Sequence, residues 1–460
     1  MIKKTLLFTL IACMCAIAAI AAEPAKPTLA AICINCHTAE QGAVRGYFDN
    51  VSFKVKTIQV KIDDAVALFK FDEDEIKVVN GAGKTGDGEF LKDNLVRKGH
   101  EIKVEYTETN GVKMAVKLIV KPPVKVSEDM LINTGDIKKL VALGPAKGKY
   151  FLFDSRPLHR FQEGYIPTAV NLPFPSFDNS AEKVLPKNKN SLIVFYCTGP
   201  TDSMSLASAI KSQKLGYTNV KVYQDGMPGW MDKNYSVISG RFLKDAWIDK
   251  GIPNVLLDVR TANEAGRGFL HGAVTFPAKQ AAKLVKGLDI KKTAPIVVYD
   301  QKGGKEAASV ASALIKTGFN NVTLLIGGFE GWKNSKYDVV SGKLTAKAIY
   351  SPKLRQGEID LSEFKKYAEE LPANVMIVDA RSIHEGHAGM LKNAKLIPVD
   401  EFKNRLAEIP KDKLIVLYSN TGVIAEVAYH TLKELGYTNV KFLSAKMHFE
   451  KNGSYTISKD

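Results

Sequence analysis

One pattern recurs three times along the chain, and this repetition constrains the fold more than any other feature of the sequence. Each copy holds an Asp-x-Arg triplet, a run of apolar residues about forty residues later, and then a glycine, an aromatic residue and an Asn-Val pair. The copies are 154–156, 192–196 and 216–220; 258–260, 295–299 and 318–322; and 379–381, 414–418 and 436–440. A period of about 105 to 120 residues is the size of a domain, so we predict a tandem array rather than a solenoid.

Between these signals, short apolar runs alternate with stretches of helical pattern, which is typical of α/β units built on a parallel sheet. The chain has 460 residues, of which 45% are hydrophobic and 25% charged. This composition excludes a disordered or polytopic membrane protein. The formal net charge of +15 favours anionic partners. The lysines are scattered and form no dense basic run between aromatic residues, so we expect no nucleic-acid partner.

Residues 1–22 have the composition of a secretory signal peptide. Lys3 and Lys4 precede an apolar run that ends in small residues at Ala21 and Ala22. We predict cleavage at this point and export, with the periplasm as the expected location. Two alternatives stay open: an uncleaved membrane anchor, and a lipid tether at Cys13, where the preceding residues resemble a lipobox.

Three of the five cysteines lie beyond the predicted signal peptide, too few for a disulfide framework. Two of them occur in segment 23–46 as Cys33-Ile34-Asn35-Cys36-His37. At this spacing two thiols attach a c-type haem and the histidine binds its iron. We therefore predict haem c on Cys33, Cys36 and His37. A disulfide between the two cysteines, a redox dithiol and half of a zinc site are the alternatives.

Residues 47–124 are predicted to form a small all-β domain. Residues 51–60 and 102–106 alternate apolar and polar side chains with the period of a strand, and glycines mark turns between such runs. We expect an antiparallel sheet or barrel of about five strands, with the haem segment packed on it. The sixth iron ligand is not identified; His100 and Met114 are the candidates nearest in sequence.

The three repeats resemble a known family. Asp154-Ser155-Arg156, followed by Gly164-Tyr165-Ile166-Pro167-Thr168-Ala169 and by Asn171-Leu172-Pro173, is similar to the pattern of the rhodanese-like (sulfurtransferase) domain. A Gly-Gly-x-x-x-Trp element is intact at 327–332 and partial at 226–230, and the third copy has Glu450 at the tryptophan position. The resemblance covers residues 126 to 460. It implies three rhodanese-like α/β domains, each a parallel sheet flanked by helices, at 126–240, 241–343 and 344–460.

In that family, the residue after the central strand is a cysteine. It takes the outer sulfur of thiosulfate or a polysulfide as a persulfide and passes this sulfur to a thiol or cyanide. The corresponding residues here are Cys197, Asp300 and Ser419. A carboxylate, or an alcohol without a general base, forms no persulfide. The resemblance therefore implies that Cys197 alone is catalytic and that the second and third domains are inactive.

The loop after Cys197 is the expected substrate-binding site, because loop N–H groups and a helix N-terminus stabilise an anion at this position. Two residues weaken it. Pro200 lacks an N–H donor. Asp202 stands where the family has arginine, and its charge raises the thiol pKa unless it caps the following helix. A buried, inert Cys197 is the alternative. The loop residues are Thr198, Gly199, Pro200, Thr201, Asp202 and Ser203.

The other two loops are expected to be structural. Asp300 precedes a loop that keeps a glycine and a lysine, yet its own carboxylate repels an incoming anion, and the loop after Ser419 has no cation. The Asp-x-Arg triplets recur in all three copies, the two without cysteine included. We therefore assign the triplets to holding the fold rather than to catalysis.

These residues together predict an exported protein that binds or transfers sulfane sulfur through a Cys197 persulfide, coupled to electron transfer by the covalent haem. Its partners are then a small sulfur anion such as thiosulfate or polysulfide, a thiol sulfur acceptor and a periplasmic redox partner. No oligomeric state is indicated. Two alternatives are kept: an electron-transfer cytochrome with a non-catalytic rhodanese-like binding scaffold, and a haem-free sulfurtransferase.

Overall fold

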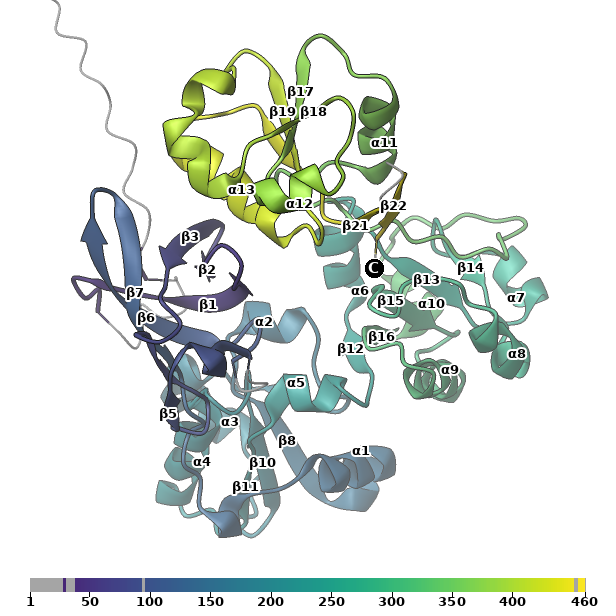
Figure 1. The fold of residues 1–460 in the computed structure, drawn as a ribbon. Coiled ribbons are helices and arrows are strands. Elements are labelled where there is room, and N and C mark those ends of the chain that lie inside the picture. Colours follow the sequence, from purple (N-terminus) through teal and green to yellow (C-terminus); the bar gives the residue numbers. More distant parts are fainter. Residues whose placement is uncertain (1–27, 30–37, 93–95, 451–453, 460) are drawn as a thin grey trace, which may run out of the picture. The chain divides into compact units, whose positions relative to one another are not determined.

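A computed structural model describes residues 28–29, 38–92, 96–450 and 454–459 (Figure 1). The chain divides into two compact units, one reaching Val79 and including Thr85–Val120, the other comprising Asn80–Lys84 and the chain from Lys121 onward. Within the described ranges, no helix is long and apolar enough to span a membrane. The predicted signal peptide, the lipobox and the haem-binding residues Cys33, Cys36 and His37 lie outside the described residues.

The first unit is a sheet of seven strands in the order β3-β2-β1-β6-β7-β4-β5. An additional pairing of Lys70 with Met114, between β3 and β7, closes the first five of these strands on themselves. Ile58, Val60 and Phe69 fill the enclosed core and are fully buried. The strands are β1 (Ala43–Ser52), β2 (Thr57–Ile62), β3 (Ala65–Lys70), β4 (Lys77–Val79), β5 (Thr85–Gly86), β6 (Glu101–Thr109) and β7 (Val112–Val120).

The single strand expected over residues 51–60 is wrong, because the chain turns in the middle of that range. β1 ends at Ser52, β2 begins at Thr57, and these two residues pair antiparallel across a tight connection. Lys56 adopts a positive φ of 45° in this turn. The alternating sequence pattern continues through the connection because each strand of a hairpin directs every second side chain toward the core. The expected strand over residues 102–106 lies within β6.

The first α/β domain has four parallel strands in the order β11-β10-β8-β9. Its central strand is apolar along its length and buried, as expected for a parallel sheet covered on both faces. The strands are β8 (Tyr150–Asp154), β9 (Val170–Asn171), β10 (Leu192–Tyr196) and β11 (Val220–Tyr223), and the helices are α1 (Thr134–Gly148), α2 (Leu158–Gln162), α3 (Phe177–Val184), α4 (Met204–Lys214) and α5 (Gly226–Met231).

The second α/β domain has five parallel strands in the order β12-β16-β15-β13-β14. Its strands are β12 (Ser236–Ile238), β13 (Val255–Asp258), β14 (Val274–Thr275), β15 (Ile296–Tyr299) and β16 (Val322–Leu325). Its helices are α6 (Gly240–Phe242), α7 (Ala262–Gly266), α8 (Ala281–Lys286), α9 (Lys305–Lys316) and α10 (Gly328–Asn334). Strand β12 lies within the expected range 126–240 yet pairs with β16, while its Val237 also bridges to Tyr165 of the first domain.

The third α/β domain has four parallel strands in the order β18-β17-β19-β20, which equals the order of the first domain read from its other edge, β9-β8-β10-β11. Its strands are β17 (Val375–Asp379), β18 (Ala394–Leu396), β19 (Leu414–Tyr418) and β20 (Val440–Phe442), with a separate hairpin of β21 (Lys446–Phe449) and β22 (Tyr455–Ser458). Its helices are α11 (Leu361–Glu369), α12 (Ile383–His387) and α13 (Val423–Glu434). Figure 1 shows the repeat: in each copy, helices flank a parallel sheet. The α/β architecture predicted from the three repeats is confirmed.

Candidate functional site

The Asp-x-Arg triplets form buried ion pairs at the ends of β8, β13 and β17. In the first domain, Nη2 of Arg156 donates to Oδ2 of Asp154 at 2.6 Å and to the carbonyl oxygen of Gly164 at 2.8 Å. The carbonyls of Gly268 and Gly389 accept the equivalent bonds from the other two arginines, at 2.7 and 2.6 Å. These bonds fit the structural role assigned to the triplets, because each arginine ties its strand end to a loop eight residues away.

Cys197 lies directly after β10, where the carboxyl ends of the parallel strands meet and ligands of such sheets bind. Its loop runs to α4, which begins at Met204. Gly226 must be glycine here: its φ is +57°, and a Cβ would lie 2.4 Å from the carbonyl oxygen of Cys197. The loop around the cysteine is therefore held by close backbone packing.

The Cys197 side chain is fully buried, and acceptor atoms surround its sulfur. Sγ lies 3.1 Å from Oγ of Ser205 and 3.4 Å from the carbonyl oxygen of Asp202. A carbonyl oxygen only accepts, so the thiol donates to Asp202, whereas the hydrogen bonds with Ser205 and Gly199 lower the thiol pKa. Burial, followed by the charge of Asp202, raises the pKa of Cys197 from 9.0 to about 12. In this conformation the sulfur is a protected thiol rather than a nucleophilic thiolate.

Asp202 occupies the N–H donors that an anion in this loop needs. Its Oδ1 accepts from the backbone N–H of Met204 at 2.9 Å, and its Oδ2 from that of Thr198 at 3.3 Å. Its carboxylate therefore caps the start of α4, as one of the sequence readings expected. Pro200 contributes no N–H, and its carbonyl oxygen accepts from the N–H of Val124 at 2.8 Å. The loop thus directs the N–H groups of Thr198 and Met204 to its own carboxylate, while hydrogen bonds of Ser205 and Gly199 with Cys197 lower the thiol pKa only in part.

Alkylation of Cys197 by iodoacetamide at pH 8 is expected to be at least about a thousandfold slower in the native chain than in the denatured chain. A pKa raised from 9.0 to about 12 lowers the thiolate fraction by that factor. Because burial favours the protonated thiol, its contribution to domain stability is complete below pH 9 and is lost as the pH rises toward 12. Mass spectrometry of the Cys197 peptide measures the rate. Equal rates in native and denatured protein would contradict the buried, protonated thiol.

Asp300 occupies the position of Cys197 in the second domain and fills the same kind of loop with its carboxylate. Oδ1 accepts from the backbone N–H groups of Lys302 at 2.9 Å and Gly303 at 2.6 Å. Oδ2 accepts from those of Gly304 and Ala307, both at 3.0 Å. Four backbone N–H groups thus converge on the buried Asp300 carboxylate at the nucleophile position, which fits the structural role expected for this loop.

Ser419 is the third equivalent, and its hydroxyl is buried. Its Oγ accepts from the backbone N–H of Ala425 at 3.2 Å, and the adjacent Asn420 side chain accepts from Nη1 of Arg381 at 3.0 Å. These bonds fit the structural role expected for this loop.

The sequence analysis missed Ser205, whose hydroxyl lies closest to the sulfur among the contacts of Cys197. It also missed Val124, which joins the segment before the first domain to the cysteine loop. The position of Ser205 could have been predicted in one way. It is the second residue of the helix after the loop, and such a residue faces back toward the strand end. The bond of Val124 had none, because it joins residues 76 positions apart through backbone atoms.

Comparison with known proteins agrees with this geometry. The model of the rhodanese-like domain matches residues 136–233, 243–335 and 360–447. A "tRNA sulfurtransferase" of Shewanella halifaxensis is 35% identical over 77 residues, which are 16% of this chain and 16% of that protein. The "Thiosulfate sulfurtransferase GlpE" of Pseudomonas entomophila is 28% identical over 81 residues, 18% of this chain and 72% of that protein.

Among solved structures, a thiosulfate sulfurtransferase from Pseudomonas aeruginosa is similar at 17% identity, with a TM-score of 0.22, over 70% of this chain and 67% of the other. The chain spans about a sixth of the Shewanella relative, so the activity of that whole protein does not transfer to it. The three family matches cover more than half of the 460 residues. The chain belongs to the rhodanese-like domain family, of which it carries three tandem copies.

Proposed function

We propose that this protein accepts sulfane sulfur on Cys197 and passes it to a thiol. One observation carries the proposal: at the equivalent position of the second domain, four backbone N–H groups hold the carboxylate of Asp300. A loop of this family in this chain thus accommodates a buried anion at that position. Cys197 is the equivalent residue able to carry sulfur. The sulfurtransferases among the relatives support the same chemistry.

The proposed reaction has two displacements at sulfur. The Cys197 thiolate attacks the outer sulfur of thiosulfate, a sulfur–sulfur bond forms, and sulfite leaves with the electron pair of the broken bond. The resulting persulfide is then attacked at its outer sulfur by an acceptor thiolate, which departs as a persulfide and returns Cys197 as a thiolate. With a polysulfide donor, the leaving group is the shortened polysulfide.

The thiol must lose its proton before the first displacement, and Asp202 opposes that step. Its charge disfavours the thiolate, and its carboxylate holds the N–H groups of Thr198 and Met204. Release of these two donors toward the sulfur would stabilise the thiolate as the Asp300 loop stabilises its carboxylate. The proposed active form therefore differs from the described one by a rearrangement of residues 198–203.

Replacing Asp202 with Asn is expected to raise the alkylation rate of Cys197 about tenfold at pH 8, since a neutral amide no longer opposes the thiolate. Asp232→Asn is the matched control: it removes the same charge from an aspartate of the first domain whose side chain is 70% exposed. The pH dependence of alkylation, followed on the Cys197 peptide, measures both variants. Equal alkylation rates in the two variants would show that the charge of Asp202 does not control the pKa of the Cys197 thiol.

The decisive experiment for sulfur transfer is loading the purified chain with thiosulfate or polysulfide. Mass spectrometry should find one added sulfur atom on the Cys197 peptide, and glutathione should remove it. Cys197→Ser should abolish transfer while leaving the fold intact, because Ser is similar in size and can keep a bond to Ser205. An unloaded Cys197 in the wild-type chain would reject the proposal. It would favour the non-catalytic binding scaffold, which the carbonyl contacts of the thiol also support.

We further propose that the chain is exported and that Cys33, Cys36 and His37 hold a c-type haem, which would supply one-electron redox chemistry when bound. In the described part of the first unit, Leu29, which is four residues before Cys33, forms an isolated β-bridge with Arg45. Nε of Arg45 is buried and has no hydrogen-bond partner among the described residues. Nη2 of the same guanidinium donates to Glu40 at 3.0 Å, and a guanidinium that binds carboxylates in this way would suit a group that carries them, such as the haem propionates.

Neither nominated sixth ligand is distinguished by its surroundings. Nε2 of His100 accepts from Nε of Arg97 at 3.2 Å, and the Met114 side chain is exposed on β7. A visible absorption spectrum with a pyridine haemochrome assay, on protein exported by cells that mature cytochromes c, tests the haem. A colourless protein would reject it and favour the haem-free sulfurtransferase. If haem is present, its potential should respond to persulfidation of Cys197; an unchanged potential would reject the coupling.

A further inference from the structure

The arginine of the Asp-x-Arg triplet has a third nitrogen, Nη1, whose partner differs between the domains. In the second domain, Nη1 of Arg260 donates to Oε1 of Gln301 at 3.1 Å. In the third domain, Nη1 of Arg381 donates to Oδ1 of Asn420 at 3.0 Å. Each acceptor directly follows the residue at the nucleophile position. A side-chain amide thus occupies this nitrogen in both domains that lack a cysteine.

In the first domain, as far as the structure describes it, this contact is absent. Thr198 follows Cys197, is exposed, and has its oxygen one bond nearer to the backbone than the amide oxygen of an asparagine. Nε and Nη2 of Arg156 bind Asp154 and Gly164 as the equivalent nitrogens do in the other two domains, so the three guanidinium groups are oriented alike. Nη1 of Arg156 has no hydrogen-bond partner among the described residues. Solvent reaches this nitrogen, because it is not one of the enclosed polar atoms without a partner.

A ring that covers the guanidinium in the other two domains has no counterpart among the described residues of the first. The ring centres of Phe329 and Phe449 lie 4.0 and 4.4 Å from the guanidinium carbon. Met227 stands in the place of Phe329, since each donates its backbone N–H to the carbonyl of the residue at the nucleophile position. The Arg156 side chain is 8% exposed, against 3% for the other two arginines. Among the three triplets, the open nitrogen therefore belongs to the domain that carries the cysteine.

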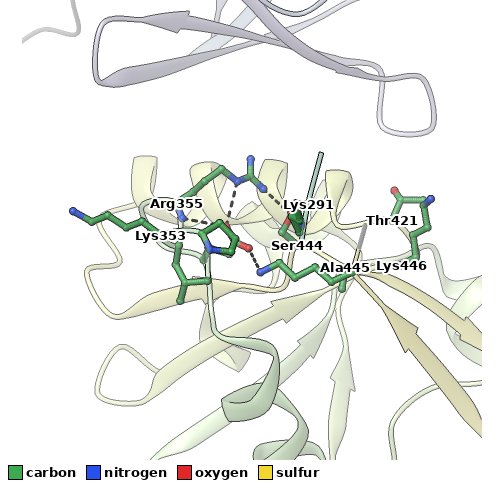
Figure 2. A pocket seen from close by; sticks show the side chains of 11 residues that line it. Lys291, Lys353, Arg355, Thr421, Ser444, Ala445 and Lys446 are labelled. Carbon is green, nitrogen blue, oxygen red and sulfur yellow. Dashed lines mark hydrogen bonds and ion pairs between the residues drawn. The ribbon is translucent and has the colours of Figure 1, made fainter. Parts of the chain in front are cut away.

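A pocket of the third domain shows the opposite arrangement. It has a volume of about 300 Å³ and is lined by Thr421, which follows β19, and by Ser444, which follows β20 (Figure 2). Its arginine, Arg355, uses all three guanidinium nitrogens. They donate to Glu358 at 3.4 Å, to Glu426 at 2.5 Å and to Ser444 at 2.8 Å. Each nitrogen of that guanidinium already has an acceptor, unlike Nη1 in the first domain.

We propose that Nη1 of Arg156 donates a hydrogen bond to an oxygen of the sulfur donor that loads Cys197. The inference rests on the proposed sulfur transfer, and it adds a binding role to an arginine whose other nitrogens hold the fold. The oxygen of the donor takes the place that a side-chain amide oxygen fills in the other two domains. Thiosulfate carries such oxygens and a polysulfide does not, so this contact selects thiosulfate-type donors. The sulfite that leaves takes the electron pair of the broken bond, and a guanidinium N–H at its oxygens stabilises that charge.

Thr198→Asn tests the contact, because it places at position 198 the amide that Asn420 supplies in the third domain. Thiosulfate is titrated calorimetrically into the full-length Cys197→Ser chain with and without this substitution, so that no sulfur is transferred. We expect the asparagine to weaken binding at least about tenfold, since its oxygen competes for the guanidinium donor. Thr198→Val is the matched control: it keeps the shape of threonine without an acceptor, and it should weaken binding less. No saturable binding by the Cys197→Ser chain, or equal effects of asparagine and valine, would overturn the proposal.

Sulfur loading separates this inference from the proposed function. The chain that keeps Cys197 is loaded with thiosulfate or with inorganic polysulfide, and mass spectrometry of the Cys197 peptide gives both rates. Thr198→Asn is expected to lower the ratio of the thiosulfate rate to the polysulfide rate at least about tenfold, and the ratio cancels changes in the reactivity of the thiol itself. Loading by both donors with an unchanged ratio would overturn the role of Arg156 and leave sulfur transfer standing. Loading by neither donor would reject sulfur transfer, and the titration would still decide the contact.

Discussion

Replacing Arg156 with Met is expected to lower the free energy of unfolding of the first α/β domain by about 3–5 kcal/mol. Arg156 is the partner of Asp154, whose side chain is fully buried, and the two groups share hydrogen bonds of 2.6 to 3.1 Å. Methionine fills a similar volume but leaves the carboxylate charged and buried with its strongest partner gone. The bond to the carbonyl of Gly164 is lost as well, which frees the loop before β9.

Hydrogen exchange of peptides from β8 and β10 measures this loss domain by domain, since a chain with several cores does not unfold in one step. Arg160→Met is the control. It removes another arginine of the same domain, whose ion pair with Glu163 has side chains 47% and 46% exposed. Such a pair contributes about 0–1 kcal/mol. Equal effects of the two substitutions would show that the buried brace does not hold the domain.

Replacing Asp300 with Cys is expected to create a reactive thiolate in a domain that has no cysteine. The four N–H groups that now hold the carboxylate would surround the new sulfur. Hydrogen bonds to the charged form lower a pKa, and thiols in such loops reach values of about 3.5 to 7.5. We therefore expect Cys at position 300 to alkylate at least about a thousandfold faster than Cys197 at pH 7.

The matched control is Ser419→Cys. The described contacts of Ser419 include a single backbone N–H donor, that of Ala425, so a thiol there should gain far less. Both substitutions are made in the Cys197→Ser chain and followed by mass spectrometry of the new cysteine's peptide. A thiol at position 300 that reacts no faster than the one at position 419 would show that the converging donors do not stabilise sulfur. The argument from Asp300 to Cys197 would then fail too.

Most of the α/β architecture was predictable because its signals are local. A parallel strand buried on both faces must be apolar throughout, so residues 192–196, 295–299 and 414–418 are read directly as β10, β15 and β19. The Asp-x-Arg brace is equally local, since the arginine bonds the carboxylate two residues before it. The first unit was less predictable from the sequence. Residues 51–60 keep one alternating pattern across a turn, and the pairing of β3 with β7 joins Lys70 and Met114, which are 44 residues apart.

The candidate site divides in the same way. The position of Cys197 at a strand end follows from the sequence, and so does the opposing charge of Asp202. Which acceptor takes which N–H does not follow, because that choice depends on distances of tenths of an ångström within the folded loop. Two corresponding loops therefore differ: one directs four N–H groups to Asp300, whereas the other directs those of Thr198 and Met204 to Asp202.

The sequence by itself determined three α/β repeats, one cysteine among the three equivalent strand-end positions, and a Cys-x-x-Cys-His motif at residues 33–37. The tertiary structure alone decided that the thiol of Cys197 is buried beside Ser205 and the carbonyl oxygen of Asp202, that β12 pairs in the sheet of the second domain, and that residues near 355, 421 and 444 line one pocket. The physical reason is the same for all three. Hydrophobic periodicity is carried by neighbouring residues, whereas burial, electrostatics and donor pairing arise between segments that only folding brings together.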